Sequence, residues 1–138
     1  MSDKYFDLHT TGIGYLNRVR DVSPDRGHPF LAVDISALHG NADNVEYTRF
    51  DCRVYGETAK AIIEQLRFAI ESKEHKVLVG FKIGDLYPET FTYKKGDRAG
   101  EIGISLKSRL LRIAWAKVDG ETVYTAPKAT ESEERQAA

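Results

Sequence analysis

The residues best suited to binding chemistry lie in residues 45–55, with the sequence VEYTRFDCRVY. At the two-residue period of a β-strand, one side of this segment is apolar and the other is aromatic and basic. The apolar side consists of Phe50, Cys52 and Val54, and the opposite side consists of Tyr47, Arg49, Asp51, Arg53 and Tyr55. Tyrosine rings can stack on bases, and guanidinium groups can neutralise phosphates. The second side therefore predicts a binding surface for a single-stranded nucleic acid.

The same aromatic and basic side has a simpler interpretation. Tyrosine and arginine can cover any exposed sheet, where they would pair across strands with carboxylates such as Asp34 and Asp51. The pattern of residues alone leaves both interpretations open.

A second candidate lies in residues 87–98, where rings alternate with cations. Its members are Tyr87, Phe91, Tyr93, Lys94, Lys95 and Arg98. In a small barrel this segment would belong to a loop that can close over a strand of DNA. The alternative is a solvated hairpin with Phe91 and Tyr93 in the core, which we favour for Phe91. Further cations that could extend a basic track are Arg18, Arg20, Lys82, Lys107, Arg109 and Arg112.

No enzymatic site emerges from the spacing of reactive residues. The histidines at positions 9, 28, 39 and 75 lack the spacing of metal ligands. The segment GDRAG at residues 96–100 lacks the Gly-Lys-Ser/Thr ending of a phosphate-binding loop. A nuclease built from Asp34, Asp51 and Asp85 receives little weight, because carboxylates are common. We expect no enzyme activity, no metal and no cofactor.

Composition is typical of a soluble globular protein. The 138 residues suffice for one domain with a hydrophobic core, and 41% of them are hydrophobic and 30% charged. No apolar run approaches the ~20 residues that cross a bilayer, and the N-terminus lacks an export signal. We therefore expect a cytoplasmic location and no contact with the membrane. The single cysteine, Cys52, cannot form an internal disulfide and is expected to be a small buried residue.

The distribution of charge matters more than its total. The formal net charge of −1 argues against a strongly basic protein that coats DNA. Residues 76–117, however, contain nine basic and four acidic residues, a local excess of five positive charges. Residues 127–138 are acidic and lack apolar periodicity, which predicts a disordered tail. We expect an N-terminal arm over residues 1–10 and a folded domain over residues 11–126.

Hydrophobic alternation in the first half of the chain predicts three strands. In residues 11–22, one side holds Ile13, Tyr15 and Val19 and the other holds Leu16, Arg18 and Arg20, with Gly12 and Gly14 indicating a bend or bulge. Turn residues at 23–29 predict a hairpin into a second strand at 30–39. Its inward residues are Leu31, Val33, Ile35 and Ala37, and Asp34 points outward. A turn at 40–44 leads to the strand at 45–55.

The period then changes to about 3.6, which predicts a helix over residues 57–72 with Thr58 as a candidate N-cap. Residues 77–83 alternate again as a strand, which the turn residues 84–88 should end, and residues 89–95 form a further extended piece. Residues 102–118 predict a long strand. Its inward residues are Ile104, Leu106 and Leu110, then, after a bulge, Leu111, Ile113 and Trp115. The pair Asp119-Gly120 predicts a hairpin into residues 121–125.

Three strands, one helix and further strands follow the order of the OB-fold. We therefore predict a mainly β protein with a five-stranded antiparallel barrel and the helix between strands 3 and 4. Strands 2 and 3 of that fold, with the adjoining loops, bind oligonucleotides or oligosaccharides. Other small barrels accept the same order of elements.

Four stretches carry a resemblance to a known family: KYFDLHTTGIGYLNRVR, VEYTRFDCRVYG, VLVGFKIGDLYPETFTYKKGDRAGE and SLKSRLLRIAWAKVDGETVY. Together they span residues 4–126 and resemble a bacterial family encoded on integrative and conjugative elements. That family is commonly labelled a replication protein of those elements and otherwise a domain of unknown function. The layout is also similar to that of bacterial single-stranded DNA-binding proteins. The acidic tail departs from theirs, because it ends in Arg-Gln-Ala-Ala and not in an apolar tip.

The resemblance and the aromatic, basic strand together imply a protein that binds single-stranded DNA with low sequence preference. It would support replication or transfer of an integrative and conjugative element. The alternative is a protein–protein interaction module that oligomerises and does not bind nucleic acid. Expected partners are single-stranded DNA, further copies of the chain in a homo-oligomer, and replication or transfer proteins of the element.

Overall fold

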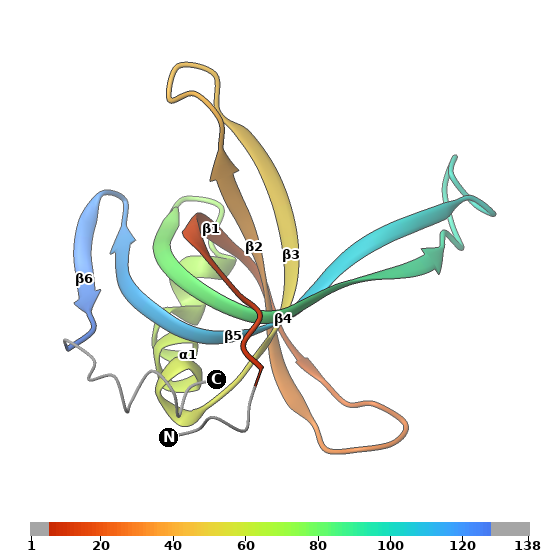
Figure 1. The fold of residues 1–138 in the computed structure, drawn as a ribbon, viewed down its shortest axis with the longest axis horizontal. Helices are drawn as coiled ribbons and strands as arrows, with labels where there is room; N and C mark the ends of the chain where they lie inside the picture. The colour runs from red at the N-terminus through yellow and green to blue at the C-terminus, as the bar shows by residue number, and fades with distance from the viewer. Residues whose placement is uncertain (1–5, 128–138) are drawn as a thin grey trace.

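The alternating stretches of the sequence form a β-barrel that carries one helix (Figure 1). The structure is a computed structural model that describes residues 6–127. In chain order the elements are β1 (His9–Val22), β2 (Phe30–His39), β3 (Glu46–Val54), α1 (Glu57–Glu71), β4 (Val77–Thr92), β5 (Ile102–Val118) and β6 (Glu121–Thr125). The predicted hairpins at residues 23–29 and 119–120 are both present, because β1 pairs with β2 and β5 with β6, each antiparallel.

The barrel closes between β3 and β5. The strand order is β3-β2-β1-β4-β5-β6, and β3 also pairs with β5 in parallel from Phe50 opposite Leu106 to Val54 opposite Leu110. This closed, OB-like ring of five strands with α1 between β3 and β4 confirms the predicted architecture. The prediction of a wholly antiparallel barrel is wrong at this seam. A closed ring with an odd number of strands cannot alternate direction throughout, so one neighbouring pair must be parallel.

The apolar side of each strand forms the core. Phe50, Cys52 and Val54 are buried inside the barrel, as the alternation predicted. The helix α1 contributes its apolar stripe, with Ile62 and Ile63 in the same core. It begins at Glu57 as expected, but its N-cap is Gly56 and no side chain caps it, so the prediction of Thr58 as the cap is wrong.

Bulges decide which side chains of β1 point inward. The pairing of β1 with β2 shifts between Asn17 and Arg20, and this extra residue lets Leu16 and Val19 both enter the core. The sequence-based grouping of Val19 with Ile13 is therefore wrong, since Ile13 is exposed on the outside. The shift follows the two glycines that suggested a bend, and does not lie at them.

Two bulges act on β5. Leu111 has no partner between Leu110 and Arg112, and Leu110 and Ile113 both lie in the core, which confirms the predicted change of side. A second unpaired residue, Ala114, changes the side again. Trp115 is consequently half-buried outside the core, and the prediction that it faces inward is wrong.

The strand β4, with 16 residues, is more than twice as long as the strand predicted over residues 77–83. Residues 84–88 were predicted to end it, yet the chain passes them through a bulge in which Asp85 has φ 57°, and pairing with β5 continues to Thr92 opposite Ile102. We call the two-stranded hairpin of residues 85–105 the arm, because it projects from the barrel (Figure 1). Ile104 was predicted to face the core and is 69% exposed, since the arm has left the barrel at that point.

Two predictions concern the chain ends. Residues 128–138 of the predicted C-terminal tail lie outside the described residues. Residues 1–5 of the N-terminal segment predicted over residues 1–10 also lie outside them. Within residues 6–127, no helix is long and apolar enough to span a bilayer.

Candidate functional site

The outer side of β3 presents its rings and guanidinium groups to solvent. Tyr47 is 58% exposed and Tyr55, directly after the strand, 48% exposed. Arg49 and Arg53 are exposed as well, and neither forms an ion pair with any residue between 6 and 127. The core residues between them hold the strand rigid, so these side chains emerge from a fixed backbone. The four predicted β3 residues thus share one accessible face.

Two cations lie over rings beside the β3–β5 seam. The guanidinium carbon of Arg53 is 4.2 Å from the centroid of Phe30, and that of Arg109 is 4.7 Å from the centroid of Tyr55. Arg53 and Arg109 are themselves register partners across the seam. Each of the two guanidinium groups is thus oriented by a flat aromatic surface.

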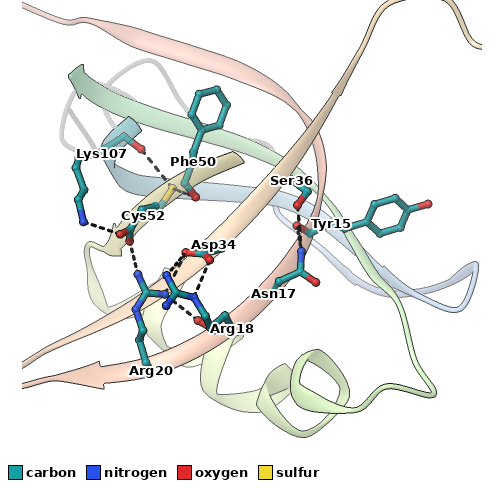
Figure 2. Close-up of polar contacts among 11 residues, drawn as sticks. Tyr15, Asn17, Arg18, Arg20, Asp34, Ser36, Phe50, Cys52 and Lys107 are labelled. Carbon is teal, nitrogen blue, oxygen red and sulfur yellow. Dashed lines mark hydrogen bonds and ion pairs between the residues drawn. The ribbon is translucent and has the colours of Figure 1, made fainter. Parts of the chain in front are cut away.

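Carboxylates hold three further cations in a cluster across β1, β2, β3 and β5. Asp34 accepts from Arg18 Nε at 2.8 Å and from Arg20 Nη1 at 3.1 Å, as Figure 2 shows. Asp51 accepts from Arg20 and from Lys107 Nζ, the latter at 2.6 Å. The side chain of Asp34 points outward as predicted but is only 3% exposed, because the arginines cover it.

The bulge in β1 makes this cluster possible. Arg18 adopts φ 51°, a left-handed conformation that is unusual for a residue other than glycine. The extra residue allows Val19 to point inward while Arg18 and Arg20 both reach Asp34 on the outside. A bulge that redirects side chains in this way is common beside functional sites.

The charged partners shift two pKa values in the cluster. Burial raises the pKa of Asp51, but the hydrogen bond from Lys107 and the charges of Arg20 and Lys107 outweigh burial and leave the pKa below its ordinary value. The hydrogen bond to Asp34 raises the pKa of Arg18 above its ordinary value, against a smaller opposing effect of burial. Both shifts favour the charged forms and thus the ion pairs.

The cations on this surface divide into those that pair with carboxylates and those that do not. The cations are Arg18, Arg20, Arg49, Arg53, Lys107 and Arg109, and the acids are Asp34, Asp51 and Asp85. Asp85 pairs with Arg109 at 2.6 Å. Six positive and three negative groups leave an excess of three positive charges. Pairing with carboxylates therefore describes Arg18, Arg20, Lys107 and Arg109, and does not describe Arg49 or Arg53.

The arm adds an aromatic and basic side of its own. Phe91 and Tyr93 pack edge to face with centroids 4.9 Å apart, and the guanidinium of Arg98 lies 4.3 Å from the Tyr93 centroid. Phe91 was predicted to lie in the core and is 41% exposed, so that prediction is wrong. Lys94 and Lys95 are exposed at the turn of the arm.

The register of the arm connects these rings to the cluster on the barrel. Tyr87 is opposite Lys107, and Phe91 is opposite Gly103, whose missing side chain leaves room for the rings of Phe91 and Tyr93. Lys107 in turn binds Asp51 on β3. Rings and cations therefore continue from β3 across β5 to the arm.

Lys82 and Arg112 lie outside the cluster of ion pairs, although Arg112 lines a hollow together with Tyr55. They are register partners on β4 and β5 and line a hollow on the outside of the barrel together with Trp115. Trp115 is not among the predicted site residues, because the alternation of β5 places it inside. A glycine facing it across the strands, Gly80, is the one signal in the sequence that a large ring could lie there.

The geometry of the carboxylates does not indicate catalysis. Asp34 and Asp51 are register partners, but their oxygens accept from arginine and lysine side chains. Across residues 6–127, no group of three or more His, Cys, Asp or Glu side chains is arranged to hold a metal ion.

Comparison with known proteins gives one match. A family model described as "Protein of unknown function (DUF3577)" matches residues 1–132. This match agrees with the resemblance to a domain of unknown function. Neither curated proteins nor solved structures gave a match.

Proposed function

The chain belongs to the DUF3577 family of proteins of unknown function, and from that premise we propose that it binds single-stranded DNA with little sequence preference. In this proposal the protein catalyses no reaction. Its resemblance to proteins encoded on integrative and conjugative elements supports a role in the replication or transfer of such an element.

The observation that carries the proposal is the outer side of β3. Two exposed tyrosines, Tyr47 and Tyr55, flank two arginines there, Arg49 and Arg53, that have no carboxylate partner among residues 6–127. Every base offers a flat face to a ring, and phosphates repeat along the strand whatever the sequence. A surface with rings and free cations at strand spacing suits such a polymer and requires no hydrogen bond that selects a base.

The neighbouring ion pairs would restrain the affinity without abolishing it. A phosphate that approaches Arg20 or Lys107 competes with Asp51, whereas Arg49 and Arg53 have no carboxylate partner within the described part of the chain. We therefore assign the main phosphate contacts to the two unpaired arginines. The paired cations would guide the strand along the surface.

Titration of the full chain with a fluorescently labelled oligothymidine tests the proposal, with binding followed by anisotropy. The logarithm of the binding constant should fall linearly with the logarithm of the salt concentration, by about 0.7 per phosphate contacted. Tyr47→Ala and Tyr55→Ala should each weaken binding by roughly 1–3 kcal/mol through loss of stacking.

The control replaces an exposed ring far from β3. Phe68 lies on the solvent side of α1, so Phe68→Ala should leave the affinity unchanged. Absence of binding at low salt by folded protein would refute the proposal. Unchanged affinity in both tyrosine variants would place the site elsewhere.

A second candidate function is self-association through the arm. Ile102 and Ile104 on β5 are 70% and 69% exposed and lie on the side of the arm opposite Phe91. A side of this kind is unusual on an isolated hairpin and is suited to an interface between copies of the chain. The two functions are compatible, because they use opposite sides of the arm.

A further inference from the structure

A second surface that combines an aromatic ring with cations lies on the outside of the barrel, at strands other than β3. It is a hollow of about 450 Å³ between β1, β4 and β5. Its lining consists of Thr11, Gly12, Ile13, Gly80, Phe81, Lys82, Arg112, Ala114 and Trp115. Two of these residues are basic and none is acidic.

Glycine holds the tryptophan in a defined position. A Cβ atom at Gly80 would lie 2.5 Å from Trp115 Nε1 and within 3.1 Å of two further atoms of its five-membered ring. The indole therefore rests on the backbone of β4, which any other residue at position 80 would prevent. The result is a half-buried ring that is fixed outside the core.

The cations of the hollow have no carboxylate partner within residues 6–127. Lys82 and Arg112 are direct register partners across β4 and β5, an arrangement of like charges that destabilises a sheet. Neither forms an ion pair with another described residue, and the one hydrogen bond of the Arg112 side chain goes to the backbone carbonyl of Pro127. Lys117 adds a third cation, with Nζ 5.5 Å from the Trp115 centroid. An anion between Lys82 and Arg112 would relieve their repulsion.

The hollow is continuous with the face already described. Arg109 lies over Tyr55, and Tyr55 and Arg112 line one further hollow beside the start of α1. From Arg109 to Trp115 the strand β5 extends at most about 20 Å. A flexible strand that leaves β3 at Tyr55 can therefore follow β5 to the tryptophan.

We propose that this hollow is a second contact site for single-stranded DNA, in which Trp115 stacks on a base and Lys82 and Arg112 bind the adjoining phosphate. The inference rests on the proposed function and adds the path of the strand: from β3, along β5, to the outside of β4. It implies that short oligonucleotides fill the β3 face alone and that longer ones reach Trp115.

The emission of Trp115 tests the path directly, because this residue is the sole tryptophan of the chain. Labelled oligothymidines of about 4 and about 15 nucleotides are titrated into the full chain, within the range of site sizes of OB-folds. Anisotropy of the label measures binding, and tryptophan emission measures contact at the hollow. The longer oligonucleotide should change the emission at saturation, and the shorter should bind without changing it.

A variant with a matched control separates the second site from the first. Lys82→Gln should weaken binding of the longer oligonucleotide several-fold and lower its salt slope by about 0.7, with no effect on the shorter one. Lys73→Gln, at an exposed lysine just after α1, should affect neither. Circular dichroism confirms that each variant is folded.

The outcomes distinguish the two proposals. If the longer oligonucleotide binds while Trp115 emission and the Lys82→Gln affinity stay unchanged, the second site is refuted and the proposed function stands. If neither oligonucleotide binds the folded chain at low salt, both are refuted.

Discussion

At the scale of single residues, two aspartates determine how much positive charge the surface can offer. Asp34 and Asp51 are register partners on β2 and β3, and they form ion pairs with Arg18, Arg20 and Lys107. Without these carboxylates, the three cations would repel one another at close range. The pairs orient the long side chains, and within residues 6–127 they leave Arg49 and Arg53 of β3 without a carboxylate partner.

Cys52 provides a test of the barrel seam at the same scale. It is fully buried, with Sγ 3.3 Å from Ser108 Oγ of β5, and burial raises its pKa to about 12. Because the thiolate is the reactive form, a thiol reagent at neutral pH should leave Cys52 unmodified in the native protein. In denaturant, one thiol per chain should react at once. Rapid modification of native protein would show that β3 and β5 separate readily.

At the scale of elements, the contacts within the arm do not account for its stability. The pairing of β4 with β1 ends at Gly84, and that of β5 with β3 ends at Leu106, so both edges of the hairpin beyond these points lack a strand neighbour among residues 6–127. A two-stranded hairpin alone is marginally stable in water. Burial of its apolar side, Ile102 and Ile104, against a second copy of the arm would therefore stabilise it.

We predict that Ile104→Glu reduces the oligomeric state of the protein. A carboxylate at this position would be buried against apolar side chains in an arm-to-arm interface, which is costly. Size-exclusion chromatography with light scattering measures the change. Val123→Glu on β6, at an exposed valine outside the arm, is the control and should keep the wild-type mass. A monomeric wild-type protein at micromolar concentration would refute self-association through the arm.

At the scale of the whole molecule, charge is separated within a chain of almost no net charge. The formal charge is −1, yet the surface from β1 across β3 to β5 carries an excess of three positive groups. Local fields of this kind attract a polyanion, while the small net charge limits non-specific adhesion. The ion pairs in that surface also connect all five barrel strands, so the charge state of the surface affects the stability of the barrel.

We predict that acid weakens the barrel partly through Asp51. Its pKa is lowered in the folded protein, so the folded state binds this proton less readily than the unfolded state. The stabilisation is present above the ordinary carboxyl pKa of 3.8 and is lost as the pH falls through the lower folded value. Asp51→Asn should cost about 1–3 kcal/mol in urea unfolding at neutral pH and less at about pH 3.

The matched control is Asp25→Asn, at an exposed aspartate in the turn between β1 and β2 that forms no ion pair within the described residues. Its effect should be small at both pH values. A loss of stability by Asp51→Asn that is equal at neutral and acid pH would mean that the charge of Asp51 does not contribute.

Local patterns of the sequence determined the order and type of the elements. Alternation at period two, the stripe at period 3.6 and the turn residues before Phe30 and after Val118 act over a few residues, so they are legible without the fold. They predicted the bounds of β2, β5 and β6, the inward side of β3 and the bulge at Leu111. They also placed the exposed tyrosines and arginines of β3 on one face.

Only the tertiary structure decided the features that depend on contacts between distant strands. A bulge after Asn17 and another at Ala114 reverse the inward side, so Val19 and Trp115 could not be placed by counting residues. Asp34 is buried because arginines from β1 cover it, and the arm exists because β4 and β5 continue pairing beyond the barrel. Pairing between strands depends on every turn and bulge that lies between the paired residues, which no short stretch of sequence specifies.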